Sequence, residues 1–103
     1  MRFQGPVVNG LRLILTKRGG RELENVGLDR WDAAEILTQG WNCSRSKRRI
    51  GTIERCLDWG HKVFRAVAIK GPYTSEGEIE EAYYLVHVSI EAHKKGRTIR
   101  EGE

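Results

Sequence analysis

No stretch of the sequence approaches the roughly 18 consecutive apolar residues that a membrane-spanning helix requires. The N-terminal segment MRFQGPVVNG has neither the apolar core nor the small-residue cleavage site of a signal peptide. We therefore expect a cytoplasmic protein that makes no membrane contact.

Motifs for common cofactors are also missing. The chain contains no G-x-x-x-x-G-K phosphate loop, no G-x-G-x-x-G dinucleotide loop and no EF-hand calcium loop. Cysteine is scarce: Cys43 and Cys56 do not form a C-x₂-C pair, and the three histidines are scattered over separate segments. Structural zinc needs ligands in close pairs, so the sequence predicts neither a metal nor a cofactor.

The length and composition indicate one globular domain. The chain has 103 residues, of which 39% are hydrophobic and 31% are charged. We expect the whole chain to form a single domain with flexible ends at residues 1–10 and 94–103. The net charge of +4 is unevenly distributed: negative charge gathers at residues 75–81 and positive charge at 45–49 and 93–100. This segregation predicts a dipolar surface.

Hydrophobic periodicity in the first part of the chain predicts a strand followed by two helices. LRLILT, residues 11–16, alternates as a strand does. After the break at Gly19-Gly20, RELENV has the spacing of a short helix and is closed by Gly27. The next helix is predicted to run from the N-cap Asp29 to Gly40.

The second half of the chain has the two-residue period of strands. Residues 61–70 and 82–90 are predicted strands, joined by an exposed, mobile connection at 71–81. Trp31 and Trp41 are predicted to pack against this sheet. In the last strand, the side predicted to face the helices contains Ala82, Tyr84, Val86, Val88 and Ile90, and the opposite side contains Tyr83, Leu85, His87 and Ser89.

Two further strands, WNCSRS and TIERCLD, are predicted to pair as a hairpin. The symmetric register places Cys43 opposite Cys56 and Arg45 opposite Glu54, which are of opposite charge. A disulfide between the facing cysteines would close a loop and stabilise the fold by about 3 kcal/mol. In a reducing cytosol the same residues would instead be two thiols packed as small hydrophobes, and both alternatives stay open.

GLDRWDAAEILTQG, residues 27–40, resembles the pattern R-G-I-S-x-x-D-V-x-x-V-L-x-x-G of small domains in the RelE/ParE toxin superfamily, which includes BrnT-like proteins. The order of elements over residues 11–92 is similar too. The resemblance implies an α+β fold: a first strand, two N-terminal helices, and a curved antiparallel sheet of three further strands. Members with known activity cleave messenger RNA, often on the ribosome, or poison gyrase, and a small antitoxin neutralises them.

The resemblance also implies a catalytic group. Its matching positions in this chain are Arg55, Arg65, His87 and Tyr83. Metal-free RNA cleavage requires deprotonation of the 2′-oxygen, stabilisation of the pentavalent phosphate and protonation of the leaving oxygen; arginine suits the second task, and histidine or tyrosine the others. One departure is K-R-G-G at residues 17–20, where the small domains usually have H-A-x-x-R-M.

The sequence leaves two functions open. In the first, the protein binds or cleaves RNA, and basic residues of the hairpin contact the phosphates. Those residues are Arg45, Lys47, Arg48 and Arg49. In the second, a non-catalytic module uses the sheet face containing Tyr83, Leu85 and His87 to dock a partner protein or a second copy as a homodimer.

Overall fold

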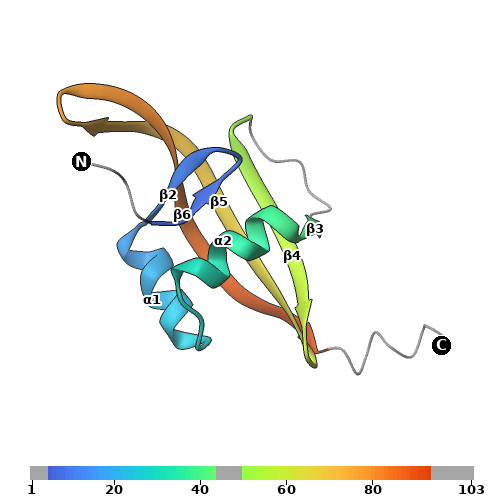
Figure 1. Ribbon diagram of the computed structural model, residues 1–103. Coiled ribbons are helices and arrows are strands. Elements are labelled where there is room, and N and C mark those ends of the chain that lie inside the picture. The colour runs from blue at the N-terminus through green and yellow to red at the C-terminus, as the bar shows by residue number, and fades with distance from the viewer. Residues whose placement is uncertain (1–4, 44–49, 94–103) are drawn as a thin grey trace.

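The computed structural model describes residues 5–43 and 50–93. Within these ranges the chain forms a mixed α+β fold of two helices and a six-stranded sheet with the order β1-β2-β6-β5-β4-β3 (Figure 1). Neighbouring strands are antiparallel except β2 and β6, which are parallel. The elements are β1 (Val7–Val8), β2 (Leu11–Leu15), α1 (Lys17–Asn25), α2 (Arg30–Gln39), β3 (Trp41–Asn42), β4 (Thr52–Trp59), β5 (Lys62–Ser75) and β6 (Glu78–His93).

The predicted α+β class is confirmed, but the number of strands is not. The sheet has six strands where the resemblance implies four. The strand that no sequence pattern indicated is β1, whose two residues are too few to show a period. Strand β3 covers the first two residues of the predicted strand WNCSRS. β1 folds back onto β2 through Asn9 and Gly10, whose φ angles of 53° and 82° are those of a tight hairpin turn.

Helix α1 begins before the two glycines that the sequence analysis treated as a break. Thr16 caps it by accepting a hydrogen bond from the backbone N–H of Gly19 at 2.9 Å. A Cβ atom at Gly19 would overlap the backbone carbonyl of Leu85, whereas one at Gly20 would lie 3.9 Å from Leu15. Gly19 is therefore the point at which α1 contacts β6 most closely.

Helix α2 has the predicted ends. Asp29 and Asp32 form a reciprocal capping box, and Gly40 is the C-cap. The prediction that Trp31 and Trp41 pack against the sheet is wrong, since they are 51% and 41% exposed. Position 31 lies one turn before the exposed Glu35, outside the apolar stripe of the helix.

Both helices cover one face of the sheet. The core that they form with β5 and β6 contains Leu23, Ala33, Ala34, Ile36, Leu37, Phe64, Ala66, Ala68, Tyr83, Leu85 and Val88. The predicted alternation of β6 is therefore wrong for its first half, in which Tyr83 and Leu85 face the helices. A bulge at Val86 reverses the alternation, because Leu85 pairs with Ala68 whereas His87 pairs with Val67. Beyond the bulge, Val88 faces the helices as predicted.

The predicted mobile connection between the last two strands is a two-stranded ribbon. Strand β5 continues to Ser75 and β6 starts at Glu78, and Glu76 and Gly77 form the turn with φ angles of 52° and 81°. We call residues 71–81 the arm. It extends past β4 and β2 and away from the body of the molecule (Figure 1).

Candidate functional site on the sheet face opposite the helices

The sheet face opposite the helices carries two rows of residues that cross β4, β5 and β6. Glu54, Val67 and His87 form the first row, because each pairs directly with the next across the strands. Cys56, Arg65 and Ser89 form the second row in the same way. Directly paired residues project to the same side of a sheet. We call these six residues and Glu91 the Arg65 face, in which Cys56, Val67 and Glu54 are only 1%, 2% and 5% exposed.

Arg65 is the centre of a polar network on this face. Its Nη1 donates to Glu54 Oε2 at 2.5 Å, and its Nε lies 3.1 Å from Glu91 Oε1 and 3.4 Å from Ser89 Oγ. The side chain of Glu54 is 6% exposed, that of Arg65 26% and that of Glu91 51%. The guanidinium therefore joins a buried carboxylate to one that faces solvent.

His87 lies at the edge of the Arg65 face, beside α1. Strand β2 ends opposite Leu85, so it does not pair with the part of β6 that follows. There, Glu22 of α1 accepts a hydrogen bond from the backbone N–H of Val88 at 2.9 Å. The same carboxylate oxygen is 3.3 Å from Nδ1 of His87. Hydrogen bonds from Val88, and then from Arg18 and His87, outweigh partial burial and lower the pKa of Glu22 from 4.5 to about 2. Glu22 is thus held ionised beside His87.

Arg55 and Tyr83 lie on the other side of the sheet. Arg55 pairs with Ala66 of the helix-side core, and its Nη1 donates to Asn42 Oδ1 at 3.0 Å. Tyr83 is 6% exposed within that core. Of the four residues that the resemblance marks as catalytic, the structure therefore brings together Arg65 and His87 on one face.

The partner-docking surface expected from the sequence is not a surface in the structure. Tyr83 and Leu85 are 6% and 0% exposed because they pack beneath the helices. Only His87, whose side chain is 38% exposed, is accessible among the three residues of that hypothesis. The expected phosphate contacts Arg45, Lys47, Arg48 and Arg49 lie outside the described residues.

Cys43 and Cys56 are joined as a disulfide with a Cα separation of 5.5 Å. The predicted hairpin register is nevertheless wrong by two residues, because Cys56 lies opposite Trp41 rather than Cys43. Gly40 sets this register: it ends α2 so close to β4 that a Cβ atom there would lie 2.5 Å from the carbonyl oxygen of Cys56. A shift of two residues leaves each side chain on its original face, so the cysteines still meet.

Glu54 is the residue of this site that the sequence analysis missed. It was expected opposite Arg45 but contacts Arg65, one strand away in the other direction. The sequence feature that indicates the contact between Glu54 and Arg65 is the β4–β5 turn, where Gly60 has a φ of 65° and Trp59 pairs with Lys62. That tight turn fixes the register that brings Glu54 to Arg65.

Comparison of the chain with protein-family models, curated proteins and solved structures finds no match in any of the three. Over residues 5–43 and 50–93, no helix is both long and apolar enough to span a membrane. In these two segments, no group of three or more histidine, cysteine, aspartate and glutamate side chains is placed to hold a metal ion.

Proposed function

We propose that this protein acts on RNA through the Arg65 face. The observation that carries the proposal is the contact between the nearly buried carboxylate of Glu54 and Arg65, with His87 on the same face. Phosphodiester transfer from a 2′-hydroxyl needs a base, a cation that stabilises the phosphate and an acid, and a carboxylate, a guanidinium and an imidazole can fill these three roles.

Each group has a role in the proposed cleavage. Glu54 accepts the proton of the 2′-hydroxyl, and the resulting oxygen attacks the adjacent phosphorus. Arg65 stabilises the negative charge of the pentavalent phosphate, and its fixed fork of donors suits two phosphate oxygens at once. His87 donates a proton to the departing 5′-oxygen, which leaves a 2′,3′-cyclic phosphate.

Phosphate has to compete with carboxylates for Arg65. Glu91 is 51% exposed and contacts Arg65 Nε, so its side chain can move into solvent when a phosphate arrives. Replacing Glu91 with glutamine is therefore expected to increase RNA affinity. Sequence-independent affinity is assigned to Arg45, Lys47, Arg48 and Arg49 of the basic segment.

The RelE/ParE resemblance supports the same proposal. From β2 onward the chain has the order strand, helix, helix and antiparallel strands that the resemblance implies, and β1 precedes it. On this basis we propose messenger RNA, free or on the ribosome, as the substrate class, and a small antitoxin-like protein as a partner that covers the Arg65 face.

The test is incubation of the purified protein with a long single-stranded RNA, with and without EDTA. The wild type and the control His61→Ala, which alters an exposed histidine in the β4–β5 turn, are expected to cleave equally in both conditions. Glu54→Gln and His87→Ala are expected to lose cleavage while they keep the wild-type circular dichroism spectrum. Equal RNA decay in all samples would refute catalysis at this face, and loss of cleavage in EDTA would refute the metal-free mechanism.

A further inference from the structure

A surface groove of about 630 Å³ lies between α1 and the start of α2. Its apolar lining comes from Leu15, Leu23, Leu28 and Trp31. Leu15 is 36% exposed and Trp31 is 51% exposed, although both are large hydrophobic side chains. The groove is therefore an apolar surface that the chain itself leaves accessible.

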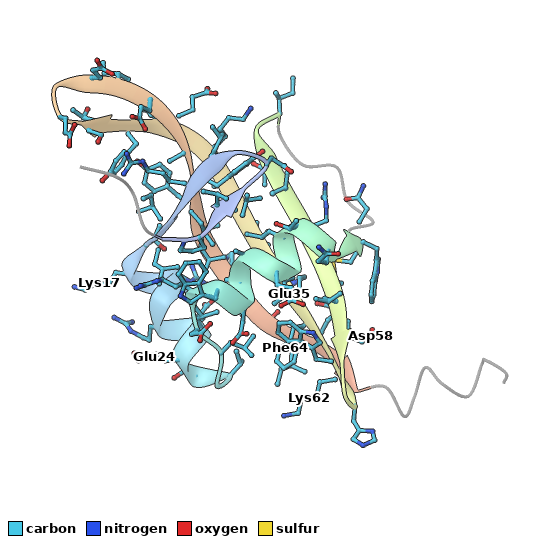
Figure 2. The ribbon with its side chains drawn as sticks, viewed as in Figure 1. Lys17, Glu24, Glu35, Asp58, Lys62 and Phe64 are labelled. Carbon is cyan, nitrogen blue, oxygen red and sulfur yellow. A yellow bond between two sulfur atoms is a disulfide. The ribbon has the colours of Figure 1, made fainter. Side chains whose placement is uncertain are left out.

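The charged lining of this groove favours an acidic occupant. Three cations line it, Lys17, Arg21 and Arg30, together with two anions, Glu24 and Asp29. The Asp29 side chain already accepts the backbone N–H of Asp32 at 2.9 Å. Figure 2 shows Lys17 and Glu24 projecting from opposite ends of α1.

The arm is complementary to the groove in charge, and it also carries an exposed apolar side chain. It contains four glutamates, Glu76, Glu78, Glu80 and Glu81, and no lysine or arginine. Between them Ile79 is 77% exposed, on a ribbon that protrudes from the body (Figure 1). The arm thus presents one apolar side chain surrounded by negative charge.

Arg12 holds the base of the arm in place. Its Nε lies 3.3 Å from Glu80 Oε1, its Nη2 donates to Ser75 Oγ at 3.2 Å, and its guanidinium lies over the Tyr73 ring at 5.0 Å from the centroid. These contacts tie the ribbon to β2. A rigid element loses less conformational entropy on docking than a flexible loop does.

We infer that the arm of one copy docks in the α1–α2 groove of a second copy, with Ile79 against Leu15 and Trp31. The groove of the same chain is not the occupied one, because Ile79 remains 77% exposed. Pairing of two arms is disfavoured, since it would bring four glutamates against four. Arm and groove are different surfaces, so each contact joins unlike parts of two copies. Two copies can exchange arms reciprocally and form a dimer, or each copy can bind the next and form a longer assembly.

Complementary variants test this inference by sedimentation equilibrium. Ile79→Glu disables the arm, Trp31→Glu disables the groove, and Val7→Glu is the matched control at an apolar residue that is 52% exposed elsewhere. The wild type and the control are expected to associate with rising concentration, and each of the other variants is expected to stay monomeric. An equimolar mixture of those two is expected to form a one-to-one pair, because it contains one intact arm and one intact groove.

Three results would overturn the inference. The first is a wild type that stays monomeric at every concentration in low salt, and the second is a mixture that does not associate. The third is a Trp31→Glu variant that loses RNA affinity but still self-associates, which would make RNA the occupant of the groove. Cleavage by the Arg65 face is measured separately, so neither proposal depends on the other.

Discussion

The two faces of the sheet are stabilised by different forces, although the same strands contribute to both. The face beneath the helices is covered by aliphatic, aromatic and small side chains, and the backbones of α1 and β6 lie close together where Gly19 meets Leu85. On the Arg65 face, charged side chains are paired around one guanidinium. Substitutions on the first face should therefore act through packing, and those on the second through charge.

The largest effect is expected at the helix contact. Gly19→Ala places a Cβ atom on the Leu85 carbonyl, so α1 must move away from β6, at a cost of about 3 kcal/mol or more in unfolding free energy. Gly20→Ala is the matched control and should stabilise the protein by about 0.5 to 1 kcal/mol through helix propensity. Urea unfolding measures both, and equal effects would contradict the close contact.

The disulfide joins Cys43, the residue after β3, to Cys56 in β4, and its reduction is expected to have the next largest effect. The cysteines are separated by 13 residues, so reduction should lower the unfolding free energy by about 3 kcal/mol. Thermal unfolding with and without dithiothreitol measures this, and Cys43→Ala should show the lowered value in both conditions. An unchanged midpoint would mean that the cysteines contribute only as packed side chains.

Breaking the charge network tests the Arg65 face directly. Arg65→Ala removes the Arg65 guanidinium from the buried Glu54 carboxylate and should cost about 2 kcal/mol. Arg18→Ala removes the more exposed contact with Glu22 and should cost about 0.3 kcal/mol. If both losses in denaturant unfolding were equally small, burial of Glu54 would not matter for stability.

A pH dependence of stability is expected at the edge between the two faces. Because the pKa of Glu22 falls from 4.5 to about 2 on folding, its ionised form stabilises the protein above pH 4.5. That contribution is lost as the pH falls from about 4.5 towards 2. The stability difference between wild type and Glu22→Gln should therefore shrink across this range. Urea unfolding of both proteins at each pH measures this, and a difference that stays constant between pH 4.5 and 2 would contradict the contacts of Glu22.

Local sequence signals predicted the elements whose ends depend on neighbouring residues. Helix α2 has the predicted cap at Asp29 and the predicted end at Gly40, because capping is decided within a few residues. The turn at Asn9-Gly10 was an equally local signal that was not interpreted, and Gly60 was interpreted only as the boundary of the strand at 61–70. Used together, they would have given strand β1 and the register of β4 with β5.

Features that depend on distant parts of the chain were predicted least well. Gly19 was interpreted as a helix break, because nothing near it in the sequence indicates the Leu85 backbone that it contacts. The bulge at Val86 reverses the face of Tyr83 without changing the apolar pattern of the strand. Both features result from packing between segments that are far apart in the sequence. Hydrophobic periodicity reports only on neighbouring residues, so it cannot predict them.

The most direct test of the central claim is to locate RNA on the protein by nuclear magnetic resonance. A short single-stranded RNA with 2′-O-methyl groups cannot be cleaved by attack of its own 2′-oxygen and can be titrated into isotope-labelled protein. RNA bound at the Arg65 face should change the shifts of the side chains of Arg65, His87 and Ser89 and leave the Trp31 indole unaffected. Shift changes confined to Trp31 and Leu15, with no change at Arg65 and His87, would contradict it.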